Sequence, residues 1–353
     1  MERLYAATAD RLLVVGPNGD VDERRVGRQS GVDDGSDRRH GADDPAGPRL
    51  ECVAVPPGDP DRAFVGTFGD GLYRSVDGGD AFQRLDTPFV DKAGDDDEHE
   101  GQAVTALTVR GHDPAVVYAG TEPSRLYRSA DGGETWTELE GIVDCPSEPE
   151  WYFPPRPHTH HVRWIEVDPS DPDRLVVGIE AGALLYTADG GRTWTERPPG
   201  SPRDNHSFAS HDREGRLYAA AGDGYAESDD GGASWRRPEE GLAHTYCWSV
   251  VADPADPDRV LVSSASGART AHRTGSADAH LYRREGGPWE RLDGNGLPTG
   301  EDVTRAVLAT TDEPGTAYAA TNRGLFVSRD FGGRWEPLVE RSIGTARGLA
   351  VVG

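Results

Sequence analysis

Short apolar segments separated by turn-forming residues run along the whole chain. Segments 71–74 and 125–128 each carry a Leu-Tyr-Arg strand pattern, followed by a turn rich in Asp and Gly and then by a second strand pattern, as at 137–139. This succession is typical of a β-hairpin. Segments such as 53–62 and 165–174 pass from one apolar strand through a Pro/Asp turn into another. One unit of the chain therefore contains four strands in about 40 to 58 residues.

The turns of these hairpins repeat one motif. It has Ser or Thr first, Asp two positions later, Gly four positions later and an aromatic residue seven positions later, and its copies lie at 75–82, 129–136, 187–194, 228–235 and 328–335. A sixth, shortened copy lies at 284–289. In such turns Ser and Asp side chains bond nearby backbone amides, Gly supplies a positive φ, and the aromatic ring covers the strands. The motif therefore indicates a structural role and needs no catalysis to explain it.

This motif resembles the Asp-box, or BNR repeat, of sialidases, sortilin-type propellers, two-domain xyloglucanases and the photosystem II stability factor. The resemblance implies a β-propeller whose boxes lie on outer strands, away from the active site. We predict that residues 1–353 form a single all-β domain, a seven-bladed β-propeller of four-stranded antiparallel blades. The seventh blade is shared by residues from about 1–27 and 345–353, so that pairing of the N- and C-terminal strands closes the ring.

The net charge of the chain makes some classes of function unfavourable. There are 62 acidic and 37 basic residues, which gives a net charge of −25, and Lys92 is the single lysine. Nucleic-acid binding is therefore disfavoured, and the composition resembles that of halophilic proteins. The acidic stretch 91–100 is expected to be a solvated loop, because it lacks the Asp-x-Asp-x-Asp-Gly spacing of a calcium site.

The same composition bears on location and partners. Three cysteines offer no disulfide framework. No apolar run approaches the roughly 20 residues that span a bilayer, and residues 1–15 do not have the pattern of a signal peptide. We expect a cytoplasmic protein, monomeric, that binds neither membranes nor nucleic acid.

One end of the propeller collects the candidate chemistry. Long insertions at 28–49, 86–103, 141–161 and 266–280, and most of the histidines, fall in connections that frame the central opening, here called the mouth. Aligning the innermost strands places one residue per blade around it: Glu51, Thr105, Arg163, His206, Trp248, Arg305 and Arg347. The predicted ligand-binding residues are Arg163, Arg305, Arg347, Glu51, His206, Trp248 and Tyr246.

Three arginines on one axis repel one another unless an anion or nearby carboxylates offset their charge. Both alternatives stay open, because Glu51, Glu122 and Glu180 occupy neighbouring positions. The arginines resemble the carboxylate-binding triad of sialidases, but the Arg-Ile-Pro motif and an identifiable Tyr–Glu nucleophile pair are missing, and sialidase propellers have six blades.

Two further sets of residues suggest catalysis. His158, His160 and His161 could ligate one divalent metal, as in some lyase propellers, or belong to an ordinary polar loop. Glu122, Glu180 and Asp204 are the candidates for an acid/base pair in glycoside hydrolysis, which needs two carboxyl groups on either side of the scissile bond.

Two functions follow. The first is a scaffold without a cofactor that binds an anionic small molecule or protein segment at the mouth, and it is preferred because no complete catalytic set can be named. The alternative is a carbohydrate-active enzyme: a sialidase-like or other glycosidase, or a metal-assisted polysaccharide lyase.

Overall fold

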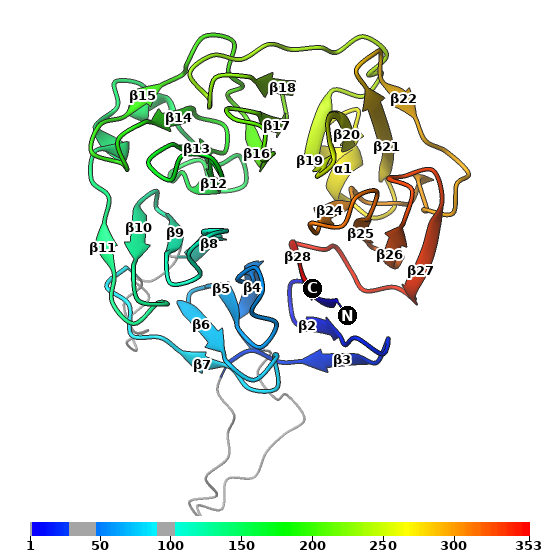
Figure 1. The fold of residues 1–353 in the computed structure, drawn as a ribbon, viewed down its shortest axis with the longest axis horizontal. Helices are drawn as coiled ribbons and strands as arrows, with labels where there is room; N and C mark the ends of the chain where they lie inside the picture. The colour runs from blue at the N-terminus through cyan, green and yellow to red at the C-terminus, as the bar shows by residue number, and fades with distance from the viewer. Residues whose placement is uncertain (1, 28–46, 90–102) are drawn as a thin grey trace, which may run out of the picture.

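The computed structural model describes residues 2–27, 47–89 and 103–353. The acidic stretch 91–100 and most of the insertion 28–49 lie outside the described residues. Nearly all regular structure is β, and the antiparallel sheets follow one another in chain order around a central axis (Figure 1). The prediction of an all-β fold is confirmed.

The two ends of the chain meet in one sheet. Its strands, in spatial order, are β28 (Gly348–Val352), β1 (Arg3–Ala7), β2 (Leu12–Val15) and β3 (Val21–Arg24). Arg3 lies opposite Val352 and Ala7 lies opposite Gly348. The N- and C-terminal segments therefore pair as the similarity between residues 3–8 and the second strands of other units predicted.

The next three sheets each have four strands. They are β4 (Arg49–Ala54), β5 (Ala63–Phe68), β6 (Leu72–Ser75) and β7 (Gln83–Arg84); β8 (Ala103–Val109), β9 (Val117–Glu122), β10 (Leu126–Ser129) and β11 (Thr137–Glu138); and β12 (Val162–Val167), β13 (Leu175–Ile179), β14 (Leu184–Thr187) and β15 (Thr195–Glu196). A single pair, Phe68 with Ala103, joins the first two of these sheets. Two short 3₁₀ helices, Ile142–Asp144 and Glu148–Glu150, precede the third.

Two of the last three sheets depart from four strands. The three sheets contain β16 (Asn205–Ser210), β17 (Leu217–Ala221) and β18 (Gly224–Ser228); β19 (Tyr246–Asp253), β20 (Asp256–Ala265), β21 (Asp278–Glu285), β22 (Glu290–Arg291) and β23 (Gly300–Glu301), with α1 (Ala268–His272) between β20 and β21; and β24 (Val307–Thr310), β25 (Ala317–Thr321), β26 (Gly324–Ser328) and β27 (Trp335–Glu340). A lone bridge between Glu227 and Arg236 stands where a fourth strand beside β18 was predicted. Pro238, which has no N–H to donate, follows and prevents its extension.

The apolar core lies between neighbouring sheets. One cluster joins Leu4 and Leu13 of the terminal sheet to Val307 and Leu325 of the last sheet. The innermost strands also contact one another in order: β28 with β4, β4 with β8, β8 with β12, β12 with β16, β16 with β19, β19 with β24, and β24 with β28. Residues where these strands begin therefore face the same end of the axis.

The five repeated turns have nearly identical geometry. The amide of each fifth residue, Gly79 in the first turn, donates to the Ser or Thr hydroxyl over 2.8–3.0 Å. The Asp carboxylate accepts a second amide two residues further on, such as that of Ala81, over 2.8–3.0 Å. Because the strands are antiparallel, these turns lie at the end of the sheets opposite the mouth.

Candidate functional site: the mouth

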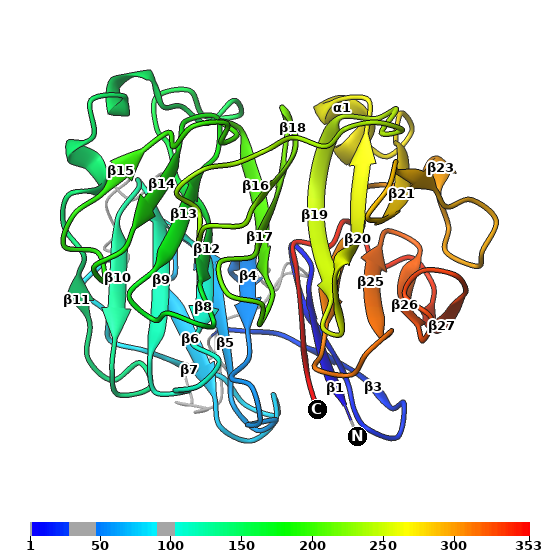
Figure 2. The same ribbon diagram turned by 45° about the horizontal axis from the view of Figure 1, so that its top comes forward.

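The mouth lies at the end of the molecule that carries α1, while both chain termini lie at the other end (Figure 2). Trp248, near the start of β19, is buried there. Arg305 and Arg163 place their Cζ atoms 3.9 and 4.9 Å from the centre of the Trp248 ring. The rings of His206 and His272 lie 4.5 Å from it. Predicted residues from separate sheets thus converge on one indole, where cation–π contacts offset part of the repulsion between the arginines.

The guanidinium of Arg305 donates hydrogen bonds to two groups of the protein itself. The side chain is buried, its Nη1 donates to Ala346 O over 2.7 Å, and its Nε donates to His272 Nδ1 over 3.2 Å. Burial, and then the charges of Arg163 and Arg347, lower the pKa of Arg305. Burial, followed by the charge of Arg305, lowers the pKa of His272 to about 2, so this imidazole is neutral and can accept the Arg305 hydrogen bond.

The other two arginines pair with carboxylates. Arg347 Nη1 donates to Glu51 Oε2 over 2.8 Å, and Arg49 donates to the second oxygen of Glu51 over 2.7 Å. Arg163 Nε lies 3.5 Å from Glu180 Oε2. These contacts favour internal pairing over an open anion site.

Thr105, a predicted ring position, and Tyr246, a predicted ligand-binding residue, both contact groups of the protein. Thr105 donates to the Val162 carbonyl over 2.6 Å, linking β8 to the next innermost strand. Tyr246 lies with its hydroxyl oxygen 3.2 Å from His272 Nε2. Since Nδ1 of neutral His272 accepts from Arg305, Nε2 carries the proton and donates to Tyr246.

Glu122, at the end of β9, is fully buried and already satisfied. Arg156 donates to both of its carboxylate oxygens, with Nε 2.8 Å from Oε1. The Arg156 guanidinium also lies over the rings of Phe68 and Phe153, at 4.9 and 4.8 Å. Sequence reasoning missed Arg156, because nothing in the 141–161 insertion indicates which of its residues folds back over β9.

Glu180, immediately after β13, lies among groups that stabilise its ionised carboxylate. His161 Nε2 lies 3.2 Å from Glu180 Oε2, and only 12% of the Glu180 side chain is exposed. Burial alone would raise its pKa, but the hydrogen bond from His161 and the charges of His161, His206 and Arg163 outweigh burial and lower the pKa to about 2.

The surroundings of Asp204 shift its pKa in the direction opposite to that of Glu180. The amide of Ala181, the residue after Glu180, donates to Asp204 Oδ1 over 3.1 Å. Burial and the nearby charge of Glu180 raise the pKa of Asp204, against the opposing influence of His206. Ala181 has φ 47°, a conformation that non-glycine residues rarely adopt and that is often retained at functional sites.

His206 lies beside Asp204. Its Nδ1 donates to the Cys247 carbonyl over 2.6 Å, so Nε2 carries the lone pair. This nitrogen is buried without a hydrogen-bond partner and lies 3.7 Å from Asp204 Oδ1. Burial lowers the pKa of His206, against the opposing charges of Asp204 and Glu180.

The three histidines of the 141–161 insertion have separate surroundings. His160 contacts Ser124 Oγ through Nδ1 at 2.8 Å and Glu148 through Nε2 at 3.1 Å, while His161 lies between Glu122 and Glu180. His158 is exposed. Among the described residues, the one group of three whose ligand atoms come close enough to hold a metal ion is His244, Asp278 and His280. The histidines proposed from sequence as one metal site thus do not form such a group.

A cavity of ≈ 780 Å³ lies at the end of the axis away from the mouth. The turns after innermost strands line it, including Pro57, Pro169 and Pro254, together with the C-terminal residues. The sequence pattern indicates functional residues only at the mouth, where the histidines, arginines and long insertions gather. Within the described ranges, no helix is long and apolar enough to cross a membrane.

Comparison with known sequences points toward carbohydrate-active proteins. No protein-family model matches the chain. A probable oligoxyloglucan-reducing end-specific xyloglucanase of Neosartorya fischeri is 28% identical over 159 residues, covering 43% of this chain and 18% of the relative. Xyloglucanase Xgh74A of Acetivibrio thermocellus is 24% identical over 259 residues, covering 61% of this chain and 29% of the relative. The chain therefore spans less than a third of the length of these relatives.

Comparison with solved structures establishes the fold. The GH74 xyloglucanase of Xanthomonas campestris aligns with a TM-score of 0.63 at 19% identity, covering 99% of this chain and 53% of that one. YCF48 bound to a D1 peptide aligns with a TM-score of 0.54 at 16% identity, covering 82% of each chain. Both are β-propellers, and the predicted propeller fold is confirmed.

Proposed function

We propose that this chain is a carbohydrate-active propeller that hydrolyses glycosidic bonds at the mouth, with Asp204 as general acid and Glu180 as general base or nucleophile. The supporting relatives are named as xyloglucanases and resemble 43% and 61% of the chain. In this proposal the five repeated turns are Asp boxes that stabilise the opposite end. The function preferred from sequence, an anion-binding scaffold, loses support because its arginines already have partners.

The observation that carries the proposal is the placement of two carboxyl groups beside one turn: Ala181, the residue after Glu180, donates its amide to Asp204. Glycoside hydrolysis requires one carboxyl group that keeps a proton for the leaving oxygen and another that stays ionised. Asp204 has the raised pKa and Glu180 the lowered one. Pairs of titratable groups whose pKa values are driven apart indicate acid and base roles. This chemistry needs no cofactor.

Tyr152 supplies a surface for the sugar. The residue is 47% exposed, and its amide donates to the Ala181 carbonyl over 3.4 Å, which places it next to the turn that follows Glu180. A flat aromatic ring with one polar end suits a sugar, which has apolar C–H faces and polar edges. Because the arginines are paired, a neutral glucan oligosaccharide fits better than an acidic sugar.

The test is hydrolysis of xyloglucan oligosaccharides by the full chain. Glu180→Gln and Asp204→Asn should each lower kcat per folded molecule by roughly 10²- to 10⁴-fold, as expected for loss of acid/base catalysis. Glu180→Gln should also lower Tm, because it removes the ion pairs with His161 and Arg163. The control is Asp212→Asn, on a turn at the far end of the axis. In the wild type, kcat should fall as pH rises through the pKa of Asp204, because the acid must be protonated. Activity that survives both substitutions would refute the assignment.

A second candidate function is binding of a protein segment without catalysis. The similar extent of this chain and YCF48, whose solved structure contains a D1 peptide, favours it. This candidate predicts no hydrolysis of any glycan and saturable binding of an extended acidic peptide, lost in Arg347→Ala. Arg347 is chosen for this substitution because 32% of its side chain remains exposed and can contact a peptide.

A further inference from the structure

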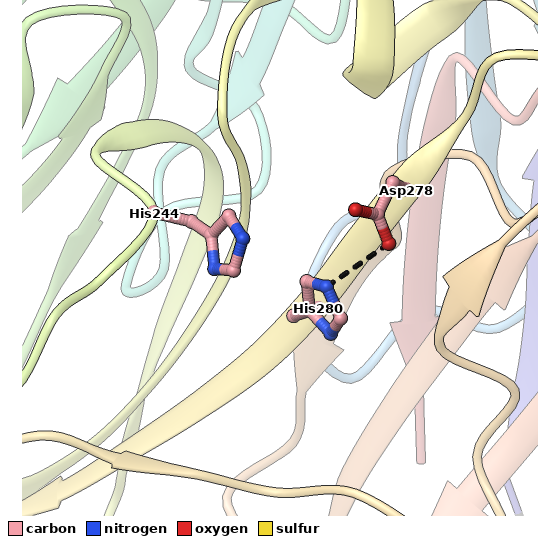
Figure 3. A group of neighbouring side chains, drawn as sticks. All are labelled: His244, Asp278 and His280. Carbon is pink, nitrogen blue, oxygen red and sulfur yellow. Dashed lines mark ion pairs between the residues drawn. The ribbon is translucent and has the colours of Figure 1, made fainter.

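Two histidines and an aspartate outside the proposed catalytic pair converge on the sheet of β19 to β23. His244 comes from the connection before β19, and Asp278 and His280 lie two residues apart at the start of β21 (Figure 3). Residues two apart on a strand face the same side. One potential ligand atom from each of the three lies within 4.8 Å of the others.

Carboxylates lie beside both ring nitrogens of His280. Nε2 is 3.1 Å from Asp278 Oδ1, and Nδ1 is 3.5 Å from Asp293 Oδ1. The side chain is only 10% exposed, and Nδ1 is buried without a hydrogen-bond partner. Two carboxylates are thus directed at one small ring that has a single proton when neutral.

His244 is oriented by a partner of its own. Its Nδ1 lies 2.5 Å from the hydroxyl of Tyr282, which also belongs to β21. The imidazole rings of His244 and His280 are stacked, with their centres 4.5 Å apart. With Nδ1 engaged by Tyr282, Nε2 is the nitrogen of His244 left for a further ligand.

We propose that His244, Asp278 and His280 bind a divalent transition metal ion, with zinc as the best match. Imidazole nitrogens and a carboxylate oxygen are ordinary zinc ligands, and three protein ligands leave one position for water. Ligand atoms about 2.1 Å from a tetrahedral ion are about 3.4 Å apart. The 3.1 Å between His280 and Asp278 is close to this value, and the half-exposed Asp278 side chain has room to adjust.

The surroundings supply the outer contacts that metal ligands require. A histidine that binds metal through one nitrogen donates the other N–H to a carboxylate or hydroxyl group, which fixes its orientation. Asp293 occupies this place beside His280, and Tyr282 beside His244. Arg291 Nε lies 2.7 Å from Asp293 Oδ2 and holds that carboxylate as an outer partner. The bound ion would tie the connection before β19 to β21.

The competing explanation is that His280 is protonated and bridges Asp278 and Asp293 without a metal. The experiment uses the full chain, stripped with EDTA and dialysed against micromolar ZnCl₂, followed by elemental analysis and thermal melts. We expect about one bound zinc per chain and a zinc-dependent rise in Tm. His244→Ala and Asp278→Asn should abolish both, and Tyr282→Phe should weaken binding about 10- to 100-fold, the usual range for an outer partner.

The matched control is His112→Ala, an exposed histidine in a turn away from this sheet, which should bind zinc like the wild type. Asp278 is half-exposed, so Asp278→Asn should fold even if a histidine variant does not. Absence of zinc from the wild type, or unchanged stoichiometry in both His244→Ala and Asp278→Asn, would overturn the proposal. Neither result depends on glycan hydrolysis, so the site stands or falls independently of the proposed activity.

Discussion

The two ends of the propeller are built on different principles. At one end, each repeated turn closes its own hydrogen bonds: Ser129 contacts Asp131 and Gly133, all within five residues. At the mouth, the arginines of the ring pair far along the chain: Arg347 pairs with Glu51, 296 residues away, and Arg305 with Ala346, 41 residues away. A motif that is repeated from sheet to sheet therefore indicates a local structural role. Residues that differ from sheet to sheet at equivalent positions of the innermost strands indicate a candidate functional site.

One turn shows how strong the local constraint is. Phe331 occupies a position with φ 52° at which the other four turns have Gly at φ 72–75°. A bulky residue is strained in this region, yet Phe331 is fully buried in the core with Leu261 and Trp335. The hydrogen bonds of the turn and the burial of the ring hold the backbone in place.

The largest expected effect falls on the repeated turns. Trp235 is 7% exposed and packs on Val176 and Phe208, so Trp235→Ala should lower the free energy of unfolding by roughly 3–5 kcal/mol. Trp194 is only partly buried, and the loss for Trp194→Ala should be clearly smaller. Denaturant unfolding measures both. Glycan hydrolysis per folded molecule should be unchanged; a drop in kcat at undiminished stability would contradict the separation of the two ends.

A middle-sized effect should appear at the mouth. Arg305→Lys keeps a positive charge but loses the hydrogen bonds to Ala346 and His272, and bonds to charged groups contribute about 1.5–3 kcal/mol. We expect a lower Tm that sugar acids, phosphate or dicarboxylates do not restore. A thermal-shift screen of the wild type against the same anions is the control. An anion that stabilises the wild type but not Arg305→Lys would return the arginines to a ligand-binding role.

The smallest effect concerns acid stability. Hydrogen bonds from Thr135 and Ser129 lower the pKa of Asp131 to about 2, and those from Thr193 and Thr187 do the same for Asp189. A carboxyl group with a lowered folded-state pKa stabilises the fold above its unfolded pKa of about 3.9 and loses that contribution as pH falls toward 2. The stability gap between wild type and Asp131→Asn should therefore be constant above pH 5 and shrink between pH 4 and 2.

Chemical unfolding across this pH range tests the effect. The turns lie in separate sheets, so the Asp131→Asn and Asp189→Asn effects should add. A gap that does not change with pH would show that the carboxylates of these turns are replaceable by amides, and that the hydroxyl and glycine alone maintain the turn.

The sequence by itself determined the strands, the repeated turns and the pairing of the chain ends, because each depends on hydrogen bonds and apolar alternation between near neighbours, or on one strand pattern recurring at both termini. It also placed Arg163, Arg305, Arg347 and Trp248 at one end, since equivalent positions of parallel innermost strands face the same way. Only the tertiary structure decided which groups pair. The contacts of Arg156 with Glu122, of His272 with Arg305 and of His244 with His280 each join segments far apart in the sequence. The paths of these connections depend on packing that no local pattern specifies. The opposite pKa shifts of Glu180 and Asp204 likewise arise from burial and surrounding charges that exist only in the folded chain.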